Sequence, residues 1–152
     1  MYELIDEEIK SEDSESEKLQ DRIIVDEAIN GKEALEKFEK MFMKSKCTNP
    51  TCKLSCYRLI IMDLNMPIMD GFQATEEILS MYKNNPNFIK QGCPPVNIVA
   101  LTSYTDLKTL NRCHEIGIKK VFHKPLKSDE IKKIICNYHF GMTEEQLNSY
   151  LE

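Results

Sequence analysis

The hydrophobic residues of this chain follow two spacings that alternate along the sequence. The short apolar runs Tyr57–Met62 and Val96–Leu101 are typical of strands buried on both faces. The run Ile23–Asp26, which is rich in β-branched residues, and the shorter run Val121–His123 predict two further strands. Elsewhere apolar residues recur every three or four positions with charges between them, which predicts amphipathic helices. The predicted helices are Lys32–Met43, Gly71–Tyr82, Asp106–Ile116, Ser128–Tyr138 and Thr143–Leu151.

Strand and helix therefore alternate, and this order is typical of an α/β fold with one parallel sheet and helices on both faces. The helix ends carry local signals. Gly117 is predicted to end one helix. Ser128 is predicted to cap another, and Thr143 with Gln146 forms a predicted capping box.

The two ends of the chain differ from the middle. Residues 1–21 are polar and acidic, and Lys10–Asp21 is expected to be solvated, although Tyr2–Glu8 begins with a short apolar piece. We predict a poorly ordered or degenerate first unit over 1–21, a central domain over 22–139 and a short C-terminal helix or tail over 140–152.

Composition narrows the possible functions. The chain has 152 residues and a net charge of −5, which argues against a nucleic-acid-binding surface. Its apolar runs are far shorter than a membrane span, and its N-terminus lacks a secretory pattern. Six cysteines without a secretory signal are expected to be reduced thiols, so we expect a cytoplasmic location.

Three of these cysteines, Cys47, Cys52 and Cys56, lie in the polar segment Ser45–Cys56. Structural zinc sites need four ligands, and no fourth ligand follows locally; Cys93 is the only plausible distant cysteine. We expect this segment to be an exposed, mobile loop with free thiols rather than a metal site.

Polar residues follow three of the predicted strands directly: Asp63, Thr102 and Lys124. The carboxyl ends of parallel strands share one edge of the sheet, where ligands bind, so these side chains are expected to converge. A carboxylate can attack phosphorus, while a lysine and a hydroxyl stabilise the phosphoryl oxygens. Taken singly, each has an ordinary alternative, as a turn aspartate, a helix cap and a surface lysine.

Four segments together resemble the receiver domain of two-component response regulators, in particular the receivers of eukaryotic hybrid histidine kinases. The resemblance covers roughly Ile23–Tyr138. It implies a flavodoxin-like fold, with the first βα unit degenerate or truncated here. The matching segments are Asp26–Phe38, Asp63–Gly71, Thr102-Ser103 and Lys124-Pro125.

The resemblance also implies a role for each site residue. Asp63 corresponds to the phosphoacceptor, Thr102 to the switch hydroxyl, and Lys124 to the lysine that precedes an often cis proline. Asn65 would bind Mg²⁺ through its backbone carbonyl, beside Asp63. Val121 stands where the family often has an aromatic switch residue, so such a switch is not expected.

The chain departs from the family pattern at its start, where a first strand ends in an acidic pair that holds the metal. Tyr2–Ile5 stands in the position of that strand, and Asp6 and Glu7 are the candidate metal ligands. Because this piece is short and Lys10–Asp21 lacks an apolar face, we expect a well-formed pocket with a weakened Mg²⁺ site.

The resulting prediction is a phosphorelay receiver that accepts a phosphoryl group on Asp63 from a histidine kinase or a histidine phosphotransfer protein. It would then switch conformation without acting as a turnover enzyme. It would lie in the cytoplasm, either alone or as part of a membrane-associated kinase in a longer native protein. The alternative is a degenerate pseudo-receiver that binds partners without phosphate. An aspartyl phosphatase is disfavoured, because such enzymes typically have a second acid where Asn65 stands.

Overall fold

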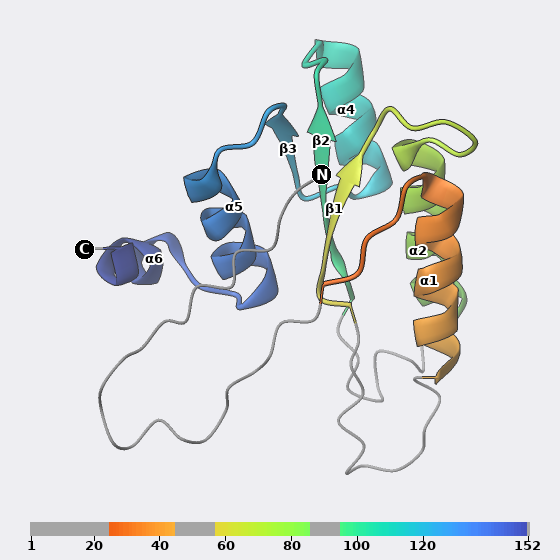
Figure 1. Ribbon diagram of the computed structural model, residues 1–152, viewed down its shortest axis with the longest axis horizontal. Helices are drawn as coiled ribbons and strands as arrows, with labels where there is room; N and C mark the ends of the chain where they lie inside the picture. Colours follow the sequence, from red (N-terminus) through yellow and green to blue (C-terminus); the bar gives the residue numbers. More distant parts are fainter. Residues whose placement is uncertain (1–24, 45–56, 86–94, 152) are drawn as a thin grey trace.

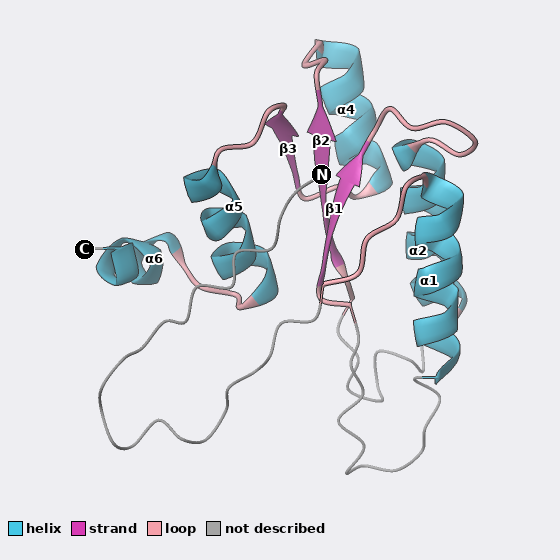
Figure 2. Ribbon diagram, viewed as in Figure 1, coloured by secondary structure: helices cyan, strands magenta, loops and turns pink. Residues whose placement is uncertain are grey.

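The computed structural model describes residues 25–44, 57–85 and 95–151. Parallel strands alternate with helices, as the hydrophobic pattern predicts (Figures 1 and 2). The elements in chain order are α1 (Gly31–Lys44), β1 (Leu59–Asp63), α2 (Gly71–Asn84), β2 (Asn97–Thr102), α4 (Leu107–Ile116), β3 (Lys120–His123), α5 (Ser128–Ile134), the π-helix η1 (Ile135–His139) and α6 (Glu144–Leu151).

The three strands form one parallel sheet in the order β1-β2-β3. Asp63 pairs with Leu101, and Thr102 pairs with His123, so the carboxyl ends of the strands lie at one edge. The predicted parallel sheet is thus confirmed for three of the four expected strands.

The fourth predicted strand, Ile23–Asp26, is not confirmed in its described part. Val25 and Asp26 have irregular backbone, and Val25 is 68% exposed. A strand is stabilised by its ladder of backbone hydrogen bonds, and no such ladder reaches Val25 or Asp26 among the described residues. Ile23 lies outside the described residues, as do the N-terminal segment 1–21 and the predicted cysteine loop Ser45–Cys56.

The helices lie on both sides of the sheet. Figure 1 shows α1 and α2 on one side and α5 on the other. On the first side, an aromatic cluster joins α1 to α2. The ring centroid of Phe38 lies 5.9 Å from that of Tyr82 and 6.1 Å from that of Tyr57. These contacts place α1 and α2 firmly against the start of β1.

Specific residues cap the start of α1 and end α4. Asn30 caps α1, because its Oδ1 accepts a hydrogen bond from Glu33 N at 2.9 Å. Glu33 in turn accepts from Ile29 N. This hydrogen bond and, to a smaller extent, the nearby Lys37 lower the pKa of Glu33. Gly117 ends α4 with a φ of 99°, as predicted.

The start of α5 differs from the prediction. Its cap is Lys127 rather than Ser128, because the side chain of Glu130 reaches back and accepts from Lys127 N at 2.9 Å. The predicted helix Ser128–Tyr138 also changes to π-helical geometry at Ile135. By contrast, the predicted capping box of Thr143 and Gln146 before α6 is present.

The described elements α1 and β1, like α2 and β2, are connected at the amino edge of the sheet (Figure 1). Lys44 ends α1 and Tyr57 lies just before β1, whereas Asn85 follows α2 and Pro95 lies just before β2. In the ranges that the structure describes, none of the helices combines the length and apolar composition needed to cross a membrane.

Candidate functional site

Asp63 is the last residue of β1, and its side chain is 31% exposed. Lys124 Nζ donates to Asp63 Oδ2, forming an ion pair. The other carboxylate oxygen, Oδ1, accepts a hydrogen bond from Asn65 N at 2.9 Å. Asp63 is therefore held in place by a cation and a backbone amide while one side of it remains open to solvent.

Lys124 follows directly after β3, as the sequence predicts. Its backbone N donates to the carbonyl oxygen of Thr102 at 3.0 Å, which ties the end of β3 to the end of β2. The peptide bond between Lys124 and Pro125 is cis, at the position that the resemblance indicated. The lysine side chain is 34% exposed, so its ammonium group can contact both Asp63 and a ligand.

Thr102 ends β2 and is 1% exposed. Its Oγ1 accepts a hydrogen bond from Tyr104 N at 3.0 Å, in the loop that leads to α4. The hydroxyl thus connects the sheet edge to this loop. The three predicted residues Asp63, Thr102 and Lys124 come from neighbouring strand ends, and their roles remain predictions.

The predicted metal ligands divide into two groups. Asn65 is exposed beside Asp63, and its carbonyl together with the Asp63 carboxylate offers the hard oxygen donors that Mg²⁺ prefers. Asp6 and Glu7 lie outside the described residues. Within the described ranges, no cluster of three or more His, Cys, Asp or Glu could hold a metal ion. The donor chemistry therefore fits Mg²⁺, but the described residues supply only part of a ligand set.

Two glycines shape the site, although the sequence indicated them only as turn or helix-start residues. A Cβ at Gly71 would lie 2.2 Å from the backbone oxygen of Asp63, so only glycine allows α2 to begin this close to β1. A Cβ at Gly31 would lie 2.5 Å from the backbone oxygen of Met69. The Asn-Gly and Asp-Gly pairs were the available signal, but they do not reveal which backbone lies opposite.

Asp70 is a further residue whose role the sequence did not specify. Its Oδ1 accepts a hydrogen bond from Gln73 N at 2.8 Å and caps α2. Asp70 therefore stabilises the start of α2, whereas Asp63 is the acid paired with Lys124.

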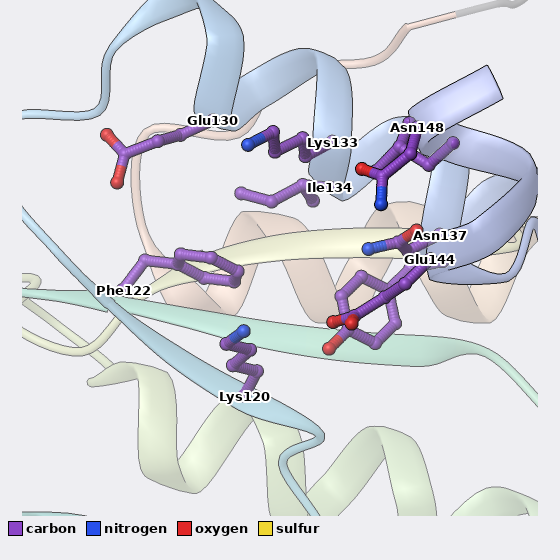
Figure 3. Close-up of a pocket in the computed structure, with 10 residues that line it drawn as sticks. Lys120, Phe122, Glu130, Lys133, Ile134, Asn137, Glu144 and Asn148 are labelled. Carbon is purple, nitrogen blue, oxygen red and sulfur yellow. The ribbon is translucent and has the colours of Figure 1, made fainter. Parts of the chain in front are cut away.

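A pocket of about 420 Å³ lies away from these residues, between β3, α5, η1 and α6 (Figure 3). Lys120 and Lys133 line it together with Glu130 and Glu144, so its charges are mixed. Lys120 Nζ lies 5.5 Å from the ring centroid of Phe122, on the pocket wall. None of Asp63, Thr102 and Lys124 lines this pocket.

The fold and the site define a class: an α/β module whose acid and lysine are paired at the carboxyl edge of a parallel sheet. The sequence pattern of the response regulator receiver domain matches residues 4–136, and the chain belongs to this family. Receiver domains are signalling modules of two-component and phosphorelay systems, rather than conventional enzymes, and the chain has this class of function.

Three similar proteins illustrate the relationship. Hybrid signal transduction histidine kinase B of Dictyostelium discoideum is 36% identical over 114 residues, which cover 71% of this chain and 5% of that protein. The receiver domain of the histidine kinase CKI1 from Arabidopsis thaliana, solved with Mg²⁺, has a TM-score of 0.54 at 23% identity, over 69% of each chain.

The receiver domain of Ssk1, solved with the phosphotransfer protein Ypd1 of Saccharomyces cerevisiae, has a TM-score of 0.57 at 24% identity. The match covers 72% of this chain and 66% of that chain. The two solved structures support the flavodoxin-like fold. The chain spans only 5 to 6% of the length of the first three curated relatives that it matches.

Proposed function

We propose that Asp63 of this receiver domain accepts a phosphoryl group from a phosphohistidine on a kinase or phosphotransfer protein. The observation that carries the proposal is the ion pair between Lys124 and Asp63 at a solvent-accessible strand end. A carboxylate oxygen of Asp63 forms the new bond to phosphorus, and the phosphorus–nitrogen bond of the donor breaks. The electron pair of that bond stays on the imidazole, which leaves as the neutral base when its other nitrogen carries a proton.

Lys124 and Thr102 have separate roles in this proposal. Lys124 balances the charge on the phosphoryl oxygens as the carboxylate becomes an acyl phosphate. Thr102 Oγ1 now accepts from Tyr104 N. When the hydroxyl turns to donate to a phosphoryl oxygen, its contact with Tyr104 changes, and the loop before α4 shifts toward a second conformation. Phosphorylation at one residue can thereby shift the conformational population of the domain.

The proposed metal is Mg²⁺, which supplies positive charge to the phosphoryl oxygens when it is bound. Asp63 and the carbonyl of Asn65 would hold it, with Asp6 and Glu7 as the remaining candidate ligands. Because Mg²⁺ sites depend on few carboxylates, we propose that the atypical N-terminal segment lowers the affinity. NMR titration with Mg²⁺ should move the Asn65 amide, and replacing both Asp6 and Glu7 by amides should weaken binding further.

The partner class and the setting follow from the same chemistry. A histidine kinase or a phosphotransfer protein is the proposed donor, and the Ssk1 receiver solved with Ypd1 offers a precedent. The domain would not turn over a substrate, because each Asp63 receives one phosphoryl group in a self-catalysed step. We place it in the cytoplasm, with receiver boundaries at 22–139 in a longer protein.

Acetyl phosphate with Mg²⁺ tests the chemistry without any protein donor. We expect intact-mass spectra to show one added phosphoryl group. Asp63→Asn should abolish it, whereas Asp129→Asn, at an exposed acid in the first turn of α5, should not. Lys124→Ala should slow the reaction roughly a hundredfold, and Lys119→Ala, at an exposed lysine outside the site, is the matched control. Failure of the unmodified protein to react at millimolar Mg²⁺ would favour the pseudo-receiver.

A further inference from the structure

The loop between β1 and α2 contains an unusual turn. Met69 N donates to the carbonyl oxygen of Pro67 at 2.9 Å, so the hydrogen bond closes around the single residue Ile68. Ile68 has a φ of 71°. This is the rare γ-turn with positive φ, and a β-branched residue is a poor choice for it. Glycine or asparagine adopts such a backbone with less strain.

The side chain of Ile68 gains little within the fold in return for this strain. It is 79% exposed, so its apolar surface remains mostly in water. The turn itself is held by its surroundings, since Gly71 N donates to Leu64 O at 3.2 Å and Gly31 N donates to Met69 O at 3.1 Å. The backbone thus keeps an isoleucine in a strained and exposed position beside the site.

A second exposed isoleucine lies on the adjoining loop. Ile29 is 82% exposed and stands two residues before Gly31, whose amide contacts Met69. Ile29 and Ile68 are the two most exposed large hydrophobic residues in the part of the chain that the structure describes. Their loops are joined by the Gly31–Met69 hydrogen bond at the carboxyl edge of the sheet, the edge that also carries Asp63.

We propose that Ile29 and Ile68 form the contact surface for the protein that delivers the phosphoryl group. This inference rests on the proposed function and adds the residues that select the donor. Asp63 lies in the rim of these loops and is only 31% exposed, so a histidine carried by a folded protein reaches it only when the surface of that protein covers the rim. Apolar side chains buried at the centre of such a contact carry much of its affinity.

The chemistry of the donor follows from the same residues. Ile29 and Ile68 present uncharged, β-branched side chains, so the complementary surface is an apolar patch beside the phosphohistidine. A small phosphodonor such as acetyl phosphate does not need this patch. Transfer from a protein and transfer from acetyl phosphate should therefore respond differently to changes at Ile29 and Ile68.

The experiment compares the two donors on the full chain. Histidine-phosphorylated Ypd1 serves as the protein donor, and the variants are Ile68→Asn, Ile29→Ser and the double variant. Asparagine suits the positive φ of position 68, so the fold should persist, as checked by circular dichroism and urea unfolding. Met43→Ser is the matched control, because Met43 is 62% exposed but lies at the amino end of the sheet, near the last turn of α1.

We expect each single change to lower kcat/KM for the protein donor about tenfold and the double change more. The acetyl phosphate rate should stay within about twofold, and Met43→Ser should match the unmodified protein with both donors. Equal losses with both donors would show that the turn positions Asp63, and would overturn the docking role. Unchanged transfer from the protein donor to the variants would also overturn the docking role. So would an unmodified chain that accepts phosphate from acetyl phosphate but not from the protein donor. A chain that reacts with neither donor would instead refute the proposed function.

Discussion

Within the described residues, the two faces of the sheet are packed to different extents. On one face, Met62 and its neighbours on β2, Ile98 and Ala100, are almost fully buried beneath the α1–α2 side. On the other face, Val99 is fully buried near α5 and η1, but Ile61 remains 39% exposed although it lies in the middle of β1. Adjacent residues of one strand thus have very different environments.

This difference bears directly on the site. Side chains alternate along a strand, so Asp63 has the same orientation as Ile61 and belongs to the less covered face. Its backbone, however, contacts Gly71 at the start of α2, on the well-packed side. The arrangement combines a closely packed backbone with a partly exposed carboxylate, as the proposed phosphoacceptor role of Asp63 requires.

The largest effect is expected from Met62→Ala. Met62 is 2% exposed within the main core, and removing its side chain leaves a cavity that the packed helices cannot fill. We expect the free energy of unfolding to fall by about 2–5 kcal/mol. Urea unfolding followed by circular dichroism measures this loss. A loss below about 1 kcal/mol would mean that this face is as loosely covered as the other.

Gly71→Ala should have the next largest effect. The added Cβ would lie 2.2 Å from the backbone oxygen of Asp63, so either β1 or the first turn of α2 must shift. Overpacking of this kind costs about 1–3 kcal/mol. Because Asp63 itself would move, the acetyl phosphate rate should also fall. Stability and rate equal to those of the unmodified protein would refute the close contact between α2 and the site.

Ile61→Ala provides the direct comparison with Met62→Ala. Since Ile61 is 39% exposed, truncation removes less buried surface and leaves no closed cavity. The expected loss of unfolding free energy is about 1 kcal/mol or less, measured in the same urea series. A loss as large as that of Met62→Ala would show that further chain covers Ile61 in solution.

The smallest effect concerns Tyr57, which stacks on Phe38 at the well-packed face. Burial, followed by the hydrogen bond to Asp26, raises the pKa of Tyr57 from 10.0 to about 12. The folded state therefore keeps the phenol proton more tightly than the unfolded chain. This contribution to stability is complete below pH 10 and is lost as the pH rises toward 12. Urea midpoints across this range should fall less steeply for Tyr57→Phe; identical slopes would contradict the raised pKa.

The sequence predicted the parts of the fold that depend on local pattern. Continuous apolar runs identified β1 and β2, and the polar residue after each strand located Asp63, Thr102 and Lys124 at one edge. The pattern could not predict that Ile23–Asp26 would lack strand geometry at Val25, because pairing depends on a neighbouring strand. Local spacing also gives no warning of the π-helix at Ile135–His139, whose apolar residues fit an ordinary helix.

The close contacts of the site could not be predicted from the sequence either. A glycine pair indicates a turn, but the distance from Gly71 to the Asp63 backbone depends on how α2 packs on the sheet. The positive φ of Ile68 is hidden for a similar reason, since isoleucine normally argues against such a backbone. The hydrogen bonds of the surrounding loops, rather than the residue itself, determine the geometry there.

The separation of the two edges of the sheet has a practical consequence for labelling. Lys44 and Tyr57, like Asn85 and Pro95, lie at the amino edge of the sheet, whereas Asp63 and Lys124 lie at the carboxyl edge. A fluorescent protein or an affinity tag inserted between Lys44 and Tyr57 would therefore be joined to the domain at the edge opposite Asp63 and Lys124. A label at the amino edge could therefore report phosphorylation of the domain while the carboxyl edge that carries Asp63 stays unaltered.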